Sequence, residues 1–341
     1  AKEFEISTTN FSKKTKNGMY EFTADSLIYN SEKHNAILTN IEVKPLLSVE
    51  EFNRRSIFQA DYVLSKTDYI ELKGINESLW LQKKILDADK LVIGNTDLNV
   101  FRNKRYPFNE KQRPPWPQDL LKNIKQQFVF DSVILKPSRV IYSELSDLSD
   151  ERGSVSFNNL QLKAGTLSNM QNIISKAPYF KADASTDLMN QAKLSVNFNF
   201  DLSSKNHQHS VKGSLQPISM KPFNSIIQKA SPIQIESGQI DKFNFDISLD
   251  NNLATGEVYF GFHDFKINVM NMESSEAKKS KLATFWANHM IFNSQNPKGN
   301  DELQPEKISY ERDVQRSVIN YWWKAILEGS KPSLGIKSEK N

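Results

Sequence analysis

The chain has 341 residues, of which 38% are hydrophobic and 25% are charged, and its net charge is +4. This length allows one large domain or two ordinary ones, and the near balance of 44 basic and 40 acidic residues argues against a nucleic-acid partner. The lack of cysteine excludes disulfides, thiolate metal sites and a cysteine nucleophile, and no window approaches the roughly 20 apolar residues of a membrane-spanning helix.

Residues 1–102 are predicted to be β-rich repeats with short helices. Apolar and polar residues alternate over 19–29 and 37–43, which is the period of a half-buried strand. Ser48 and Glu51 have the spacing of a capping box, which predicts a short helix through Arg55, and Asn76 is expected to cap another. Further strands are predicted over residues 59–64, 69–73, 90–94 and 97–102.

Residues 103–117 form the clearest break in the pattern, because they hold four prolines and show no periodicity. Proline cannot donate a ladder hydrogen bond, so this segment is unfit for a central strand. We predict that it is a linker, or a strap that lies over a sheet edge. Pro117 is expected at the first position of a helix.

Residues 118–273 are predicted to form an antiparallel β region. Lys193–Leu202 alternates throughout, and residues 207–215 are its expected hairpin partner. A turn at Asp250–Asn252 separates two more alternating runs and predicts a second hairpin. The apolar sides of these strands consist of Leu194, Val196, Phe198, Phe200, Phe243, Phe245, Ile247, Val258, Phe260 and Phe262.

These apolar sides must be buried against a second sheet, against helices, or against a bound ligand. The predicted helices are short and too few to cover a long sheet. A β-sandwich would satisfy the pattern, and composition alone favours it. A single curved sheet that holds acyl chains satisfies the same pattern, with the residues named above as its lipid-binding lining.

Residues 274–341 are predicted to be a helical cap. Helical spacing is present near residues 282–290 and again from Arg312 to Leu327. In the second helix the candidate cap or membrane-contacting residues are Val318, Tyr321, Trp322, Trp323 and Ile326. We expect this helix to plug the end of the apolar sheet. Contact with anionic lipid head groups through Arg312, Arg316 and Lys324 is the alternative.

Motifs for catalysis or metal binding are absent from the sequence. There is no nucleophile elbow, phosphate-binding loop, dinucleotide fingerprint or H-E-x-x-H sequence. His207 and His209 could chelate a metal, but they lack a third ligand, so a solvated loop is expected. The acidic run Glu144–Glu151 is likewise expected to be a solvated loop. We therefore expect neither an enzyme nor a cofactor.

Several segments together resemble the AsmA-like proteins of Gram-negative bacteria, over nearly the whole chain. Residues 20–29 read Y-x-F-x-A-x-x-L-x-Y and residues 36–43 read A-x-L-x-x-I-x-V. The other matching segments are Ser237–Ile240, Ala254–Val258, Phe285–Asn288, Asn296–Pro297, Tyr310–Asp313 and Asn320–Lys324, followed by Gly329. The resemblance implies a mainly β fold with short peripheral helices, in which an elongated, curved antiparallel sheet forms a taco-like groove with a C-terminal helix.

The resemblance also implies a function and a location. AsmA-like proteins lie in the periplasm, are tethered to the inner membrane by an N-terminal helix, and take part in phospholipid movement and outer-membrane homeostasis. Since the sequence begins at Ala1 without such a helix, we expect the anchor to have been removed. The expected partner is a phospholipid or another acyl-chain lipid. The alternative is a scaffold or accessory subunit of an outer-membrane protein assembly complex that holds no lipid.

Overall fold

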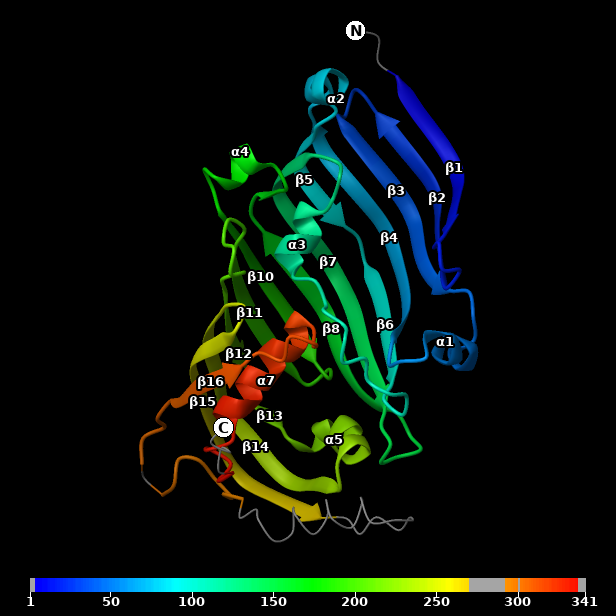
Figure 1. Cartoon of the computed structure of the whole chain (residues 1–341). Coiled ribbons are helices and arrows are strands. Elements are labelled where there is room, and N and C mark those ends of the chain that lie inside the picture. Colours follow the sequence, from blue (N-terminus) through cyan, green and yellow to red (C-terminus); the bar gives the residue numbers. More distant parts are fainter. Residues whose placement is uncertain (1–3, 270–291, 300, 337–341) are drawn as a thin grey trace.

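The computed structural model describes residues 4–269, 292–299 and 301–336. One sheet of 16 strands dominates it and curves around a concave side on which helices α3 (Pro117–Lys122) and α7 (Val318–Ser330) lie (Figure 1). The main path through the sheet is β1-β2-β3-β4-β5-β7-β8-β10-β11-β12-β14-β15-β16. The expected mainly β fold with short helices and a C-terminal helix is confirmed.

The N-terminal half of the sheet is built from strands that follow one another in the chain. They are β1 (Glu5–Lys14), β2 (Tyr20–Asn30), β3 (Asn35–Pro45), β4 (Asp61–Ile75), β5 (Leu86–Ile93) and β6 (Thr96–Asn103). Strands β5 and β6 follow one another end to end between β4 and β7 (Phe128–Leu145). Both are antiparallel to β4 and parallel to β7. The sheet is therefore mixed, which corrects the expectation of a purely antiparallel sheet. The parallel pairing arises because the chain crosses the concave side between β6 and β7.

The C-terminal half of the sheet is antiparallel. Its longer strands are β8 (Gly153–Ala164), β10 (Tyr179–Leu188), β11 (Ala192–Asp201), β12 (His209–Leu215), β14 (Ile233–Leu249), β15 (Leu253–Val269) and β16 (Glu306–Glu311), and its short ones are β9 (Leu167–Ser168) and β13 (Ile218–Ser219). The predicted hairpins β11–β12 and β14–β15 are both confirmed. In the second hairpin, a Cβ on Gly256 would lie 2.0 Å from the Asp246 carbonyl oxygen, so only glycine fits there.

Short helices punctuate the sheet. They are α1 (Val49–Ser56), α2 (Glu77–Lys83), α4 (Gln171–Ile174), the 3-10 turn η1 (Lys221–Phe223) and α5 (Asn224–Ala230). The predicted capping box of Ser48 and Glu51 is present at α1, and the Asn76 side chain caps α2. The predicted helical cap 274–341 contains strand β16, which pairs with β15, and its first part, including Phe285–Asn288, lies outside the described residues.

Asparagine residues bend several strands along a common line. Asn10 in β1, Asn40 in β3 and Asn159 in β8 all have positive φ, between 49 and 62°. Asn40 Nδ2 donates to Asp25 Oδ2 at 2.7 Å, and Asn95 Nδ2 donates to Asp68 Oδ2 at 3.0 Å. Asparagine tolerates the left-handed conformation better than most residues. The bends let long strands follow the curvature of the sheet.

The main core lies on the concave side of the C-terminal half, beneath α7. Ile247, Ala254, Val258 and Ala325 are fully buried in it, and Trp116 reaches it from the segment before α3. A smaller cluster around Phe128 and Phe130 packs below α3. Because β6 pairs with β7, the sheet is continuous even though the proline-rich segment 103–117 separates these strands in the sequence.

Candidate functional site

The N-terminal half of the concave side carries a row of residues that are apolar except for Ser65. Phe22, Val43, Ser65, Leu98 and Val140 lie directly opposite one another on successive strands, so their side chains share one side of the sheet. The next residue in the row, Phe157, packs against the core beneath α7. The row therefore faces the concave side.

Apolar residues near this row are exposed in the structure. Phe22 is 45% exposed and Phe11, opposite Ala24 on the same side, is 38% exposed. Ile6 is 57% exposed, and its partner Tyr29 packs against the cluster below α3. We call Ile6, Phe11, Phe22, Leu27, Val43 and Leu98 the open concave surface. None of them belongs to a packed core cluster within the described residues.

The predicted lipid-binding residues lie together on the concave side of the C-terminal half, but protein covers them. Phe200, Phe245, Ile247, Val258, Phe260 and Phe262 are at most 9% exposed. Leu194, Val196, Phe198 and Phe243 are partly buried and pack against the same core. Trp322 of α7 lies against Phe198 and Phe200, with ring centroids 5.2 and 6.2 Å apart. In this structure these residues form a protein core.

Helix α7 supplies most of this cover. It begins at Val318, later than the predicted Arg312, because Ser317 accepts a hydrogen bond from the Asn320 amide and caps it. Tyr321 is 1% exposed, and Val318, Trp322 and Ile326 pack against the core. Trp323 is 57% exposed on the outer side. The helix thus lies where a plug was expected, with one of its predicted residues facing away from the core.

The strap, residues 103–117, crosses the concave side (Figure 1). This differs from the expectation that it would lie over a sheet edge. At its start, Gln59 Nε2 donates to the carbonyl oxygens of Lys104 and Tyr106 at 3.2 and 3.0 Å. At its end, the Arg312 guanidinium lies 3.7 Å from the centroid of Trp116. The strap runs inward because Trp116 is buried in the core.

The strap also contacts the linker between β16 and α7. The Arg316 guanidinium lies 3.6 Å from the centroid of the Phe108 ring. Gln112 Nε2 donates to the Gln315 carbonyl oxygen at 2.9 Å. The strap and α7 therefore form one cover over the C-terminal concave side.

His209 is buried beneath this cover and His207 is partly buried, so the expectation of a solvated loop is wrong for these two side chains. His209 Nε2 accepts a hydrogen bond from Trp322 Nε1 at 2.9 Å, and its Nδ1 donates to the His207 carbonyl oxygen at 2.8 Å. The His207 ring stacks on Trp116 and lies 2.8 Å from Asp119 Oδ1. Burial lowers the pKa of His209. The burial of His209 could have been predicted from the sequence, because the alternation that places Val211 inward also places His209 inward.

The acidic run Glu144–Glu151 is ion-paired at several points. Glu144 belongs to β7, is buried, and lies 2.6 Å from Lys104 Nζ, so it is no solvated loop residue. Asp150 pairs with Arg105, and Glu151 pairs with Lys229. No group of three or more metal-ligating side chains occurs in the part of the chain that the structure describes.

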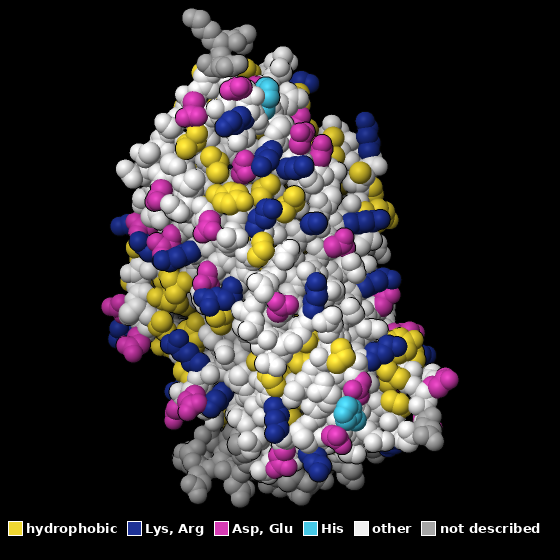
Figure 2. Space-filling model, turned by 180° about the vertical axis from the view of Figure 1, so that it is seen from behind, with side chains coloured by type: hydrophobic (Ala, Val, Ile, Leu, Met, Phe, Trp, Pro, Cys, Tyr) yellow, Lys and Arg dark blue, Asp and Glu magenta, His cyan; other side chains and the backbone are white. Residues whose placement is uncertain are grey.

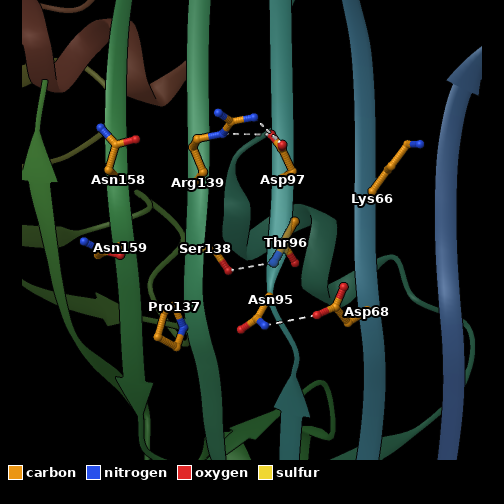
Figure 3. Close-up of a pocket in the computed structure, with 10 residues that line it drawn as sticks. All are labelled: Lys66, Asp68, Asn95, Thr96, Asp97, Pro137, Ser138, Arg139, Asn158 and Asn159. Carbon is orange, nitrogen blue, oxygen red and sulfur yellow. Dashed lines mark hydrogen bonds and ion pairs between the residues drawn. The ribbon is translucent and has the colours of Figure 1, made fainter. Parts of the chain in front are cut away.

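A hollow of about 340 Å³ lies on the convex side, over the line of bends (Figure 3). Its charged and polar groups satisfy one another, since Arg139 pairs with Asp97 and Asn95 donates to Asp68. Basic and acidic side chains are interspersed across this side of the molecule (Figure 2). The hollow is explained by the bend of the sheet and offers no unpaired charge to a ligand.

Comparison with known proteins identifies no relative: no family model matches the chain, and no curated protein matches it. Among the described residues, no helix has the length and apolar character needed to cross a membrane.

Proposed function

We propose that this chain binds the acyl chains of phospholipid on its open concave surface. The observation that carries the proposal is the open concave surface, on which Ile6, Phe11, Phe22 and Leu27 are exposed and no packed cluster of the described residues covers them. Exposed apolar patches on a folded protein mark sites for an apolar ligand or partner. We name lipid as that ligand because a curved sheet can enclose a flexible chain along its length.

The energetics of such binding are favourable. The strands behind the surface pair with neighbours on both sides, except β1, whose one partner among the described strands is β2, so away from this edge the surface offers side chains without unpaired peptide groups. Each methylene group that becomes fully buried contributes about 0.8 kcal/mol, and one that lies on an open surface contributes part of this value.

The resemblance to AsmA-like proteins supports a biological setting for this activity. It favours the periplasm, a role in conducting phospholipid, and a contribution to outer-membrane biogenesis or homeostasis. This periplasmic role is part of the same proposal and requires that the protein binds lipid.

Organic extraction of the purified protein, followed by mass spectrometry, tests the proposal directly. We expect stoichiometric phospholipid from the unaltered chain and a loss of most of it from Phe22→Asp. The matched control is Leu64→Asp, because Leu64 is 40% exposed on the opposite, convex side and should leave lipid content unchanged. Both variants should fold, since both side chains are already half exposed. Absence of lipid from the unaltered chain, or equal losses from both variants, would refute the proposal.

One observation favours the second candidate, a scaffold subunit without lipid. The C-terminal concave side is packed with the protein's own side chains beneath α7. If the extract contains no stoichiometric lipid while the protein is fully folded, the exposed concave residues are better explained as a protein-binding surface.

A further inference from the structure

The hydrogen bond that joins β12 to α7 has an acceptor that can be protonated. His209 Nδ1 lies 2.8 Å from the His207 carbonyl oxygen, which can only accept, so Nδ1 carries the hydrogen. The other nitrogen, Nε2, then has a free lone pair and accepts from Trp322 Nε1 at 2.9 Å. His209 is 5% exposed, so water does not replace either partner. The neutral imidazole fits this position with both nitrogens satisfied.

A protonated His209 would fit this position poorly. Its Nε2 would carry a hydrogen directed at the Trp322 N–H, so that two donors face each other. The Phe200 ring stacks on the imidazole at 5.3 Å, and Trp116 lies edge-on at 5.6 Å. Neither ring replaces the water that a buried cation loses.

The charged groups around His209 come from every neighbouring element. Arg312, on the linker before α7, opposes a positive charge there, and His207 on the preceding turn does the same when protonated. Asp250, at the turn after β14, is the acidic group that favours the charge. Asp119 of α3 is engaged with His207. Tyr321 of α7 stays neutral, because burial raises its pKa.

We propose that His209 and Trp322 form a pH-sensitive latch, and that its opening in mildly acidic solution releases α7 and uncovers a second surface for acyl chains. The newly uncovered side chains would include Phe198, Phe200 and Val258, which contact α7 or lie beneath it. The identity of the ligand rests on the proposed function, whereas the latch itself does not.

The surroundings of α7 suit a displaceable cover. The helix is joined to β16 by the non-helical residues 312–317, so it can move without breaking a regular element. Its Tyr321 hydroxyl is buried without a hydrogen-bond partner, so this group adds no polar anchor. Val318, Trp322 and Ile326 pack against the core through apolar contacts, which an acyl chain could replace.

The direction of the pH dependence follows from the lowered pKa of His209. The released state has the ordinary value of 6.5, and the closed state has a lower one. The released state therefore binds more protons below pH 6.5, so the closed state loses stability as the pH falls through this value. Above pH 6.5, the hydrogen bond between Trp322 and His209 contributes its full free energy to the closed state.

Hydrogen exchange of the full chain tests the latch without any lipid. From about pH 8 to about pH 5.5, we expect the protection factors of the α7 amides to fall by about tenfold relative to those of β11. His209→Gln should remove this dependence while keeping α7 docked, because the glutamine oxygen accepts from Trp322 and does not titrate. His263→Gln is the control, since His263 is half exposed and pairs with Asp241 on the β14–β15 hairpin. Unchanged α7 protection in the unaltered chain, or an unchanged response in His209→Gln, would overturn the latch.

A disulfide lock tests the second surface. The chain has no cysteine, so Gly329→Cys with Ile308→Cys introduces the only pair. A Cβ on Gly329 would lie 2.5 Å from Ile308 Cγ1, so the two positions are neighbours on α7 and β16, and the shorter side chain of Ile308→Cys relieves this close contact. With a pyrene-labelled fatty acid as probe, we expect extra binding at about pH 5.5, its loss in the oxidised protein, and its return on reduction.

The outcomes separate the two proposals. Release of α7 at low pH without fatty-acid binding at any pH keeps the latch and refutes lipid binding. Equal binding at both pH values, with α7 protected throughout, keeps lipid binding and refutes the latch. Extra binding that persists in the oxidised protein refutes the second surface.

Discussion

At the scale of single residues, the bends in the strands depend on asparagine. Asn40 has φ 49° in the middle of β3, where nearly every residue of the strand is otherwise extended. Its side chain also fixes Asp25 of the neighbouring strand through a 2.7 Å hydrogen bond. A residue with a branched Cβ is strongly disfavoured in this conformation.

We therefore predict that Asn40→Val lowers the free energy of unfolding by about 1–3 kcal/mol. Asn40→Gly should cost less, because glycine adopts positive φ freely and loses only the hydrogen bond to Asp25. Urea denaturation followed by circular dichroism measures both values. Equal losses in the two variants would show that the hydrogen bond matters and the backbone conformation does not.

At the scale of elements, alternation in the sequence predicted the strands well where one side is strongly apolar. The β14–β15 hairpin and the β11–β12 pair follow directly from runs such as Phe243–Leu249. Strand β1 was not predicted, because Glu5–Lys14 has almost no apolar alternation and every residue in it is exposed. Strand β10 was missed because Ala182 and Ala184 make a weak pattern.

Local sequence patterns could not predict that α7 and the strap cover the C-terminal core. The sequence identified which side chains share the concave side, but not that Trp116 and Trp322 would lie on them. These contacts join residues about 90 to 200 positions apart in the chain, and periodicity carries no information on such separations. The parallel pairing of β6 with β7 is non-local in the same sense. Burial of His209 was predictable from its register on β12, had the alternation been extended by one step.

Trp116 anchors the strap, so its removal should detach this element. The residue is 6% exposed and contacts His207, Tyr321 and Arg312. We predict that Trp116→Ala lowers the free energy of unfolding by about 3–5 kcal/mol, as is typical of a buried tryptophan. Urea denaturation measures this loss. Trp80→Ala is the control, because Trp80 is 40% exposed on α2 and should change stability by less than about 1 kcal/mol. Similar small losses for both would mean that the strap is held by its other contacts.

At the scale of the whole molecule, the two halves of one sheet differ in how they bury their concave side. The C-terminal half has a thick core with cover from α7 and the strap. In the N-terminal half, β1 has no buried residue and β2 buries only Ala24. Strand β1 is also the end of the sheet, with β2 as its one partner among the described strands. Local opening is easiest where few apolar contacts are buried.

This asymmetry predicts an ordered pattern of hydrogen exchange at neutral pH. Amides of β14 and β15 should exchange most slowly, because their strands lie at the centre of the core, and those of β1 and β2 should exchange fastest. Addition of phospholipid should slow exchange in β1, β2, β3 and β6, which carry the open concave surface, and leave β14 and β15 unchanged. Exchange measured by mass spectrometry with and without lipid resolves these segments. Protection that appears only in β14 and β15 would place the lipid beneath α7, and uniform protection along the chain would mean that lipid acts on global stability and not at a surface.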